Sequence, residues 1–399
     1  MKCNLALGFA NNIDYEITWS GSVMEALALE YDVRLADLDA KTPIDSERGL
    51  LTSILSFLRS GDGGECSVKS NCIIESFSSR FEKRITLGGT APRAAMAANI
   101  MGVKGAVHMV NINDHVRRKL PEGIKYVCSA EKDNIYPHLI IQFGKGDSVR
   151  LADGTISAPR ANRVIYSDDA EAVNMKINED FTGFMADARA VLISGFNCMR
   201  DGDLIKKRAE TVRRMLDAAR PDCLVYYEDS GFYEHAHRYI IAGEIEHAVS
   251  VHGMNEDEIS EYIERPVDLL NPRDMSDALV TARQRLSCKT LVLHTRFYAA
   301  AYGQNTRELR SALDAGVIMS GGRYCYGDGM DADAYERVKT MKRQDVAINF
   351  ARELESLLAD KAICVPSVDA SPEKATTVGL GDTFVGGFLA SASMRERYG

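Results

Sequence analysis

The segment TTVGLGDTFVGGFLA, residues 376–390, places an aspartate between two glycines and an apolar helical pattern. Gly379 and Gly381 allow the backbone to turn sharply and to present amide N–H groups, and an anion could lie on these amides and on the dipole of the following helix. The Asp382 carboxylate could then take a proton from a hydroxyl while the amides stabilise charge on a transferred phosphoryl group. The simpler alternative is that Asp382 only caps the helix, and the turn taken by itself favours that role.

The elements that must position this turn follow from the pattern of apolar residues. Apolar and β-branched runs typical of buried parallel strands occupy residues 4–9, 105–112, 190–196, 223–228, 247–251 and 290–295. Between them, helical patterns occupy residues 46–60, 90–101, 201–219, 255–263, 273–286, 306–315 and 342–359. This alternation predicts an α/β/α fold of three layers with a mainly parallel central sheet. Ligands of such sheets bind at the carboxyl ends of the strands, and Asp382 follows the apolar run 362–368.

Two regions interrupt the alternation, residues 12–83 and 123–185. Their segments are shorter and more polar, and the period of two in YPHLIIQFG and SVRLADG is typical of antiparallel strands. We therefore expect these regions to form a smaller, β-rich lid domain over one end of a large domain. The large domain would consist of residues 1–11, 84–122 and 186–399.

Composition limits the class of protein. Lys and Arg number 48 against 57 Asp and Glu, which gives a net charge of −9 and excludes the basic surface of a nucleic-acid-binding protein. The nine cysteines form no C-x-x-C pair and suggest reduced thiols in the cytoplasm. No run approaches the roughly 20 apolar residues of a membrane span, and the short opening run, which no cleavage site follows, predicts a first strand rather than a signal peptide. Nothing in the sequence indicates an oligomeric state.

Four further segments accompany the glycine-aspartate turn in a fixed order: LGGTAPRAAMAAN (87–99), ISGFN (193–197), VHGMNEDEI (251–259) and VLHTRFYA (292–299). Together with the turn they resemble the ADP-dependent sugar kinases, the glucokinases and phosphofructokinases of the ribokinase-like superfamily. The resemblance extends from about residue 5 to 390. The turn alone indicates only the superfamily, whereas the ordered set indicates this branch. It implies a ribokinase-like fold and transfer of the β-phosphoryl group of ADP to a sugar hydroxyl, with release of AMP.

The resemblance implies a role for each residue of the turn. Asp382 matches the general base, and the backbone of Gly379, Leu380 and Gly381 matches the anion hole. A loose, charge-spread transition state needs this kind of positioning and electrostatic stabilisation.

Magnesium is implied by two carboxylates. Glu258, in the segment Asn255 to Glu258, matches the family glutamate that organises Mg²⁺ and its waters, and Glu228 matches the acidic residue that assists the metal. Magnesium prefers oxygen ligands and is commonly held by one or two carboxylates together with substrate phosphates. Tyr226 departs from the family, whose archaeal members usually have His there. Taken alone, the acidic segment equally fits a solvated helix start.

Sugar binding is implied at three places. Asp14 in GFANNID matches an aspartate that accepts from sugar hydroxyls, although it also suits a turn. Gly88 and Gly89 match the Gly-Gly turn beneath the sugar, and Asn197 matches a polar position near the substrate or caps the next element.

The chain departs from the family pattern just after the Gly-Gly turn. Thr90 and Pro92 stand where the family has Gln and Gly, and Arg93 follows. These departures bear on which sugar fits.

Nucleotide binding is implied at His294 and Thr295, in the segment that the family uses near the nucleotide, and at Asn255 and Val378. For His294 the alternative is an ordinary residue at the end of a strand.

The acceptor depends on one carboxylate. Glu65 in RSGDGGEC resembles the sugar-binding glutamate of the glucokinases, and a carboxylate there would repel a phosphorylated sugar, so it favours glucose. Arg163 and Arg200 could contact a phosphate, which leaves fructose 6-phosphate open.

Two other functions stay open. One is an ATP-dependent ribokinase-like kinase of a sugar or nucleoside, and the other is a catalytically silent sugar or nucleotide sensor. Asp382, Glu258 and the turn glycines argue against the sensor, because a sensor needs no general base.

Overall fold

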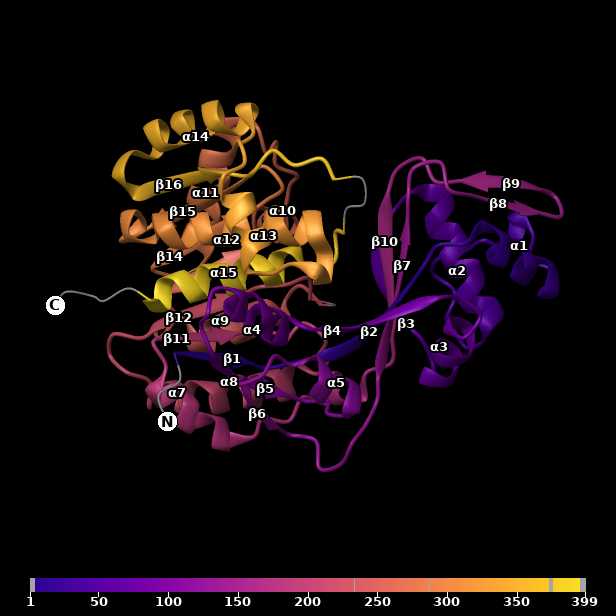
Figure 1. The fold of residues 1–399 in the computed structure, drawn as a ribbon, viewed down its shortest axis with the longest axis horizontal. Helices are drawn as coiled ribbons and strands as arrows, with labels where there is room; N and C mark the ends of the chain where they lie inside the picture. Colours follow the sequence, from indigo (N-terminus) through magenta and orange to yellow (C-terminus); the bar gives the residue numbers. More distant parts are fainter. Residues whose placement is uncertain (1–3, 233, 287, 373–375, 395–399) are drawn as a thin grey trace.

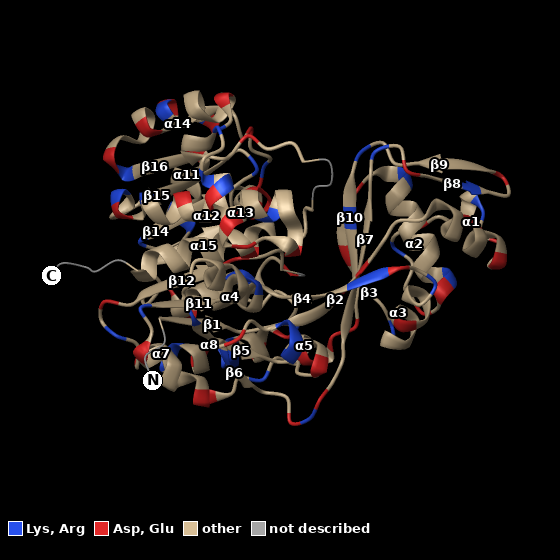
Figure 2. Cartoon of the chain, viewed as in Figure 1, with Lys and Arg blue, Asp and Glu red and all other residues tan. Residues whose placement is uncertain are grey.

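The computed structural model describes residues 4–232, 234–286, 288–372 and 376–394. A large unit and a smaller unit are joined by long strands (Figure 1). Acidic and basic residues are interspersed along both units (Figure 2). In the part of the chain described, no helix combines the length and the apolar character that crossing a bilayer requires.

A nine-stranded sheet forms the centre of the large unit. In spatial order its strands are β16 (Ala362–Pro366), β15 (Tyr298–Gly303), β14 (Thr290–His294), β13 (Val251–Met254), β12 (Leu224–Glu228), β11 (Ala190–Ile193), β1 (Leu5–Gly8), β5 (Gly105–Met109) and β6 (Lys125–Cys128). Neighbours from β14 to β6 run parallel, whereas β15 is antiparallel to both β14 and β16. β16 therefore points the same way as the parallel strands, and its carboxyl end lies at the same edge of the sheet.

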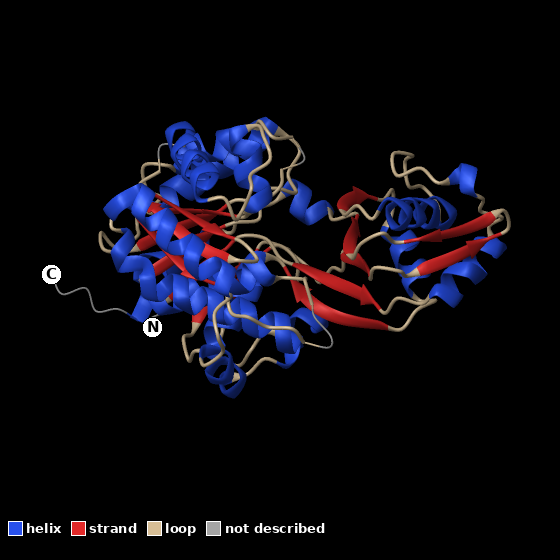
Figure 3. Cartoon of the chain, turned by 90° about the horizontal axis from the view of Figure 1, so that it is seen from above, coloured by secondary structure: helices blue, strands red, loops and turns tan. Residues whose placement is uncertain are grey.

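Helices cover both faces of this sheet, as Figure 3 shows. One face packs against α4 (Thr90–Ile100), α12 (Arg310–Tyr326) and α15 (Leu380–Met394). The other face packs against α8 (Gly202–Leu216), α9 (His237–Ile245), α10 (Glu256–Ile263), α11 (Pro272–Arg285) and α14 (Asp345–Leu358). Within β1, Leu5 and Leu7 join the first layer and Ala6 joins the second, because successive side chains of a strand point to opposite faces. The three-layer prediction is confirmed.

The smaller unit has a five-stranded sheet of its own. Its spatial order is β3 (Gly64–Ser67), β10 (Asn162–Ser167), β7 (Pro137–Phe143), β2 (Asn12–Ile17) and β4 (Lys83–Gly88). The sheet is mixed rather than antiparallel throughout, since β2 with β7 and β3 with β10 are parallel pairs. Apolar residues of one face pack with α1 (Gly21–Glu30), α2 (Glu47–Ser60) and α3 (Asn71–Ser78).

The remaining elements are short. They are the β8 (Ser148–Leu151) and β9 (Gly154–Ser157) hairpin, the helices α5 (Asp114–Lys119), α6 (Ala170–Asn174), α7 (Thr182–Asp187) and α13 (Ala332–Lys339), and the 3₁₀ turns η1 (Leu35–Asp37), η2 (Glu179–Phe181), η3 (Thr306–Leu309), η4 (Gly327–Gly329) and η5 (Ala359–Lys361).

Several expected boundaries are wrong in the structure. β6 lies in the region 123–185 that was expected in the lid, yet it pairs with β5 at the edge of the large sheet. Its polar pattern is explained by this edge position, which leaves its side chains partly exposed. β4 pairs with β2 in the smaller sheet although most of it falls in 84–122. The strand expected at 247–251 begins only at Val251, because α9 and the turn after it extend to residue 248.

Candidate active site

The glycine-aspartate turn starts a helix at the carboxyl edge of the large sheet. Gly379 has a φ of 71°, and its carbonyl accepts from the backbone N–H and the hydroxyl of Thr383 at 3.0 and 2.6 Å. Leu380, Gly381 and Asp382 then form the first turn of α15, where backbone N–H groups have no acceptor within the helix. These amides can therefore bind an anion, as the sequence predicts.

Asp382 projects from this first turn, and a quarter of its side chain is exposed. Its Oδ2 lies 3.8 Å from Nε of Arg93 in α4. A capping aspartate accepts a hydrogen bond from a backbone amide. The Asp382 carboxylate makes no such bond in the described residues. The role of Asp382 as general base stays a prediction.

Two carboxylates of the large sheet lie at the same edge. Glu228 is the last residue of β12 and is buried, and its Oε1 accepts from Nε2 of His294, the last residue of β14, at 2.7 Å. The rings of His294 and Phe384 of α15 lie 4.9 Å apart in a tilted arrangement, one turn into the helix that carries Asp382. This histidine therefore links the Glu228 carboxylate to the glycine-aspartate turn.

Glu258 is the second buried carboxylate. It forms a capping box at the start of α10, where its Oε2 accepts from the backbone N–H of Asn255 at 2.6 Å and its Oε1 accepts from the Asn255 amide at 2.9 Å. Burial raises the pKa of Glu258 well above its usual value, and the negative charges of Asp229 and Glu228 raise it further. Burial opposes a charged His294, but Glu228 raises the pKa of that ring above its usual value.

These residues fit a magnesium ion. Oε2 of Glu228 is buried beside the Tyr226 hydroxyl, and a cation would compensate the charge of this carboxylate and relieve its repulsion with Glu258. No group of three or more His, Cys, Asp or Glu in that part of the chain is arranged to hold a metal. A site with few protein ligands, completed by waters and substrate phosphates, is the usual mode for Mg²⁺. Tyr226, at the position of the family's His, packs its ring on Phe388 of α15.

The polar face of the smaller sheet supplies the opposite wall. Ile13, Tyr15 and Ile17 of β2 pack into the core, so Asp14 faces the other way. The register pairs Asp14 with Thr86 on β4 and with His138 on β7, which brings these three side chains to one face.

Further members of this polar face come from β10 and β3. Ile140, two residues after His138 on β7, pairs with Ile165 on β10, and Ile165 pairs with Glu65 on β3. Glu65 therefore shares the face of Asp14. Arg163, two residues before Ile165, lies on the same face. Arg200 donates to the Ser67 hydroxyl on β3. The structure thus brings the predicted Asp14, Glu65 and both arginines to one side of the smaller sheet.

His138 and Asp169 belong to this site and were missed by the sequence analysis. Nε2 of His138 lies 3.3 Å from Oδ2 of Asp169, and the nearby charges of Asp169, Asp14 and Glu65 raise the pKa of this buried histidine although burial opposes them. The alternation in YPHLIIQFG could have placed His138 on the same face as other polar residues, but pairing with β2 was not predictable from it.

The Gly-Gly turn lies where the smaller sheet meets the large unit. Gly88 ends β4 directly against Asp14: a side chain added there would come within 2.6 Å of Asp14 Oδ2. Gly89, with a φ of 90°, precedes α4. Asn197 follows β11 at the carboxyl edge of the large sheet and is half-buried.

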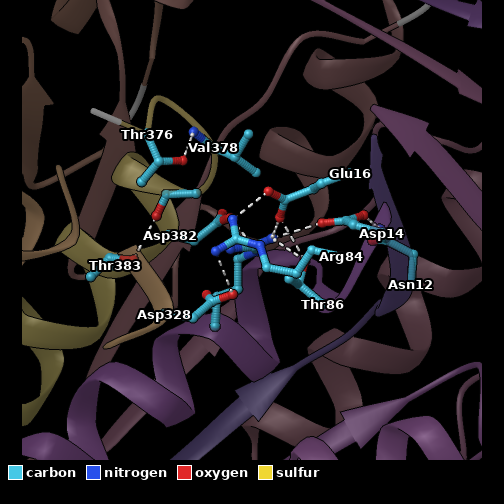
Figure 4. Close-up of polar contacts among 12 residues, drawn as sticks. Asn12, Asp14, Glu16, Arg84, Thr86, Asp328, Thr376, Val378, Asp382 and Thr383 are labelled. Atoms are coloured by element: carbon cyan, nitrogen blue, oxygen red, sulfur yellow. Dashed lines mark hydrogen bonds and ion pairs between the residues drawn. The ribbon is translucent and has the colours of Figure 1, made fainter. Parts of the chain in front are cut away.

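Arg93 connects the two walls. Its Nη2 donates to Oδ2 of Asp14 at 2.7 Å, and its Nε lies 3.8 Å from Oδ2 of Asp382. Arg84 forms two further ion pairs, with Glu16 at 2.6 Å and with Asp328 at 3.4 Å, and Figure 4 shows these residues beside Asp14 and Asp382. Asp328 in turn pairs with Arg323.

Arg323 completes the connection to the turn, because its Nε donates to the carbonyl of Val378 at 3.1 Å. The sequence analysis gave Arg93 no role and did not include Arg84, Arg323 or Asp328.

Comparison with known proteins gives the family. The family described as ADP-specific phosphofructokinase/glucokinase conserved region matches residues 3–390. The chain belongs to this family. The ADP-specific phosphofructokinase of Pyrococcus furiosus is 24% identical over 308 residues, which are 67% of this chain and 66% of that protein. The match thus spans slightly less than two thirds of the relative.

Solved structures have the same fold. A hypothetical ADP-dependent phosphofructokinase from Pyrococcus horikoshii OT3 is 19% identical, matches 98% of each chain and has a TM-score of 0.77. An ADP-dependent kinase in complex with fructose-6-phosphate and ADPβS is 16% identical, with 99% of this chain and 94% of that one covered and a TM-score of 0.77. The ribokinase-like fold and the resemblance to the ADP-dependent sugar kinases are confirmed.

As a member of the ADP-specific phosphofructokinase/glucokinase family, the chain has candidate nucleotide-binding residues along one edge. Thr295 closes the β14–β15 turn, where its hydroxyl donates to the Tyr298 carbonyl at 3.0 Å. Asn255 caps α10, Val378 is buried before the turn, and His294 holds Glu228. Each therefore has a structural contact, and nucleotide binding by these four residues stays a prediction.

Proposed function

We propose that this protein is a sugar kinase that transfers the β-phosphoryl group of ADP to a sugar hydroxyl and releases AMP. The observation that carries the proposal is the position of Asp382, which stands in the first turn of α15 between the buried carboxylates of the large sheet and the polar face of the smaller sheet. This position supports a general base, an anion site and an acceptor wall that act on the same phosphoryl group.

In this proposal the acceptor sugar lies against the face that carries Asp14, Glu65 and His138. Asp382 takes the proton of the attacking hydroxyl. The amides of Leu380 and Gly381 stabilise the charge that develops on the transferred group. The bond between the β-phosphorus and the bridging oxygen of ADP breaks, and AMP leaves with that oxygen.

Glu228 and Glu258 would hold magnesium. Mg²⁺, when bound, neutralises phosphate charge and orients the nucleotide. His294 fixes the orientation of Glu228 by its hydrogen bond, in the manner of residues that orient metal ligands.

Glucose is the acceptor that the carboxylates favour. Asp14, Glu65 and Asp169 surround His138, and three carboxylates would repel a sugar phosphate. Fructose 6-phosphate is the second candidate, because Arg163 and Arg200 border the same face and because the Pyrococcus furiosus relative carries the name phosphofructokinase.

The test is a matrix of ADP or ATP against glucose, fructose 6-phosphate or no sugar, with magnesium present and both AMP and ADP measured. We expect AMP only with ADP and glucose. AMP with fructose 6-phosphate instead would reassign the acceptor, ADP formed from ATP would support an ATP-dependent kinase, and silence throughout would favour the sensor.

A further inference from the structure

Arg93 is a buried cation that lies within ion-pair distance of three carboxylates, Asp14 and Glu16 on β2 and Asp382 on α15. It lies in the first turns of α4, and only 6% of its side chain is exposed. Nη2 lies 2.7 Å from Asp14 Oδ2, and Nε lies 3.8 Å from Asp382 Oδ2. One guanidinium therefore spans the candidate acceptor-binding carboxylate and the candidate base.

The guanidinium also packs directly against the catalytic turn. A Cβ placed on Gly379 would lie 2.7 Å from Nη1 and 2.9 Å from Cδ of Arg93. The absence of a side chain at Gly379 is therefore what allows Arg93 to approach the backbone before Asp382. The Arg93 guanidinium thus supports the backbone of Gly379. The hydrogen bond from Arg323 Nε to the Val378 carbonyl supports the residue before it.

Burying a cation is costly unless its charge is paired and its donors are used. Burial opposes the charged form of Arg93, but Asp14 and Asp382 raise its pKa above the usual value, so it stays charged. Arg93 follows the two positions, Thr90 and Pro92, at which this chain departs from its family's pattern.

We propose that Arg93 is a positioning residue that holds Asp14 and Asp382 in a fixed mutual geometry, so that an acceptor hydroxyl oriented by Asp14 meets the base. The proposal rests on the sugar kinase function proposed above. Because Oδ2 of Asp382 faces Arg93, Oδ1 is left to take the hydroxyl proton. Arginine suits the task because its planar fork reaches two carboxylates at once, whereas the single ammonium of lysine reaches one.

The experiment compares the steady-state kinetics of wild type, Arg93→Met, Arg93→Lys and the control Arg80→Met. Arg80 is also paired with a carboxylate, Glu30 at 3.2 Å, but it is exposed and lies outside the candidate site. We expect Arg93→Met to lower kcat by about 100-fold and to raise the KM for the sugar by about tenfold, since small misplacements of reacting groups have effects of this size. The KM for ADP should stay within about threefold of wild type, and Arg80→Met should keep kcat within about threefold.

Several outcomes would overturn the proposal. One is a folded Arg93→Met protein with wild-type kcat and sugar KM, and another is an equal loss of sugar and ADP affinity with a lower melting temperature, which a structural role alone predicts. If Arg93→Met does not fold, Arg93→Lys decides: a kcat lowered by about tenfold or more supports the proposal, and a wild-type kcat contradicts it. A wild-type protein that transfers no phosphoryl group to any sugar would instead overturn the proposed function, and the inference with it.

Discussion

The two carboxylate oxygens of Glu228 have different surroundings. Its Oε1 accepts a hydrogen bond from His294, while its buried Oε2 is the atom that we propose to face magnesium. The sequence allowed this residue to be predicted, because an acidic residue at the end of an apolar run lies at the ligand-binding edge of a parallel sheet. The link from Glu228 through His294 to Phe384 could not be predicted, since it joins three segments that are far apart in the chain.

Replacing Glu228 by Gln tests its role at the magnesium site. The substitution keeps the volume and removes the charge, so we expect the magnesium concentration for half-maximal activity to rise by about tenfold or more. A magnesium titration of the rate measures this. The exposed Glu353→Gln on α14 is the control, and an unchanged titration of Glu228→Gln would contradict the assignment.

The elements that carry Arg93 and His138 were predicted from the sequence, but the roles of these two residues were not. Both are polar residues in segments whose element was predicted, but their roles come from pairing between β2, β4, β7 and α4. Strand register depends on contacts between distant segments, and one sequence contains no direct record of them.

At the scale of elements, most strands of the large sheet were predictable because buried parallel strands are continuous apolar runs. β15 was not, since its run of alanines in YAAAYG lacks the β-branched residues of a typical strand. The polar ribbon of β2 and β4 was also missed, although Asn12, Asp14 and Glu16 alternate with apolar residues. That alternation puts the carboxylates of Asp14 and Glu16 on the polar face of the smaller sheet.

His108 on β5 joins three elements of the large unit. The backbone N–H of Asn178 donates to its Nε2 at 2.9 Å, so Nδ1 carries the proton and donates to the Phe9 carbonyl at 3.1 Å. Burial lowers the pKa of His108 to about 4, from an ordinary value of 6.5. The neutral ring is therefore the form that the folded protein requires.

The pH dependence of stability follows from this shift. Because the unfolded chain takes up this proton at higher pH than the folded chain does, the stabilisation is complete above about pH 6.5 and is lost as the pH falls towards 4, by up to about 3 kcal/mol. Denaturant unfolding of wild type and His108→Gln at several pH values measures it. We expect the variant to lose less stability over this window, with the exposed His247→Gln as control. Equal losses in all three proteins would contradict the expectation.

At the scale of the whole molecule, the site is divided between two units. Asp14 and Glu65 lie on the smaller sheet and Asp382 lies on the large unit, while long strands connect the two (Figure 3). A sugar that contacts both walls would draw the part of the smaller sheet that carries Glu65 towards the large unit and exclude water from the phosphoryl group, while Arg93 keeps Asp14 beside Asp382. The lid was predictable because its segments break the α/β alternation, whereas its boundaries were not, because β4 and β6 carry no sign of which sheet they join.

Small-angle scattering tests this closure. We expect the radius of gyration to fall when glucose and a nucleotide are added together, since both walls then have a ligand to bind. Asp14→Asn, which should bind sugar poorly, is the matched control and should show a smaller change. A radius that does not change in wild type under saturating ligands would count against domain closure.

The most direct test of the account is the rate of AMP formation by Asp382→Asn, measured in single turnovers with ADP, magnesium and the accepted sugar. Asparagine keeps the size of the side chain and removes the base, so we predict a rate about 1,000-fold below wild type, with sugar and ADP affinities measured by calorimetry within about threefold. A rate within tenfold of wild type would show that Asp382 is not the general base.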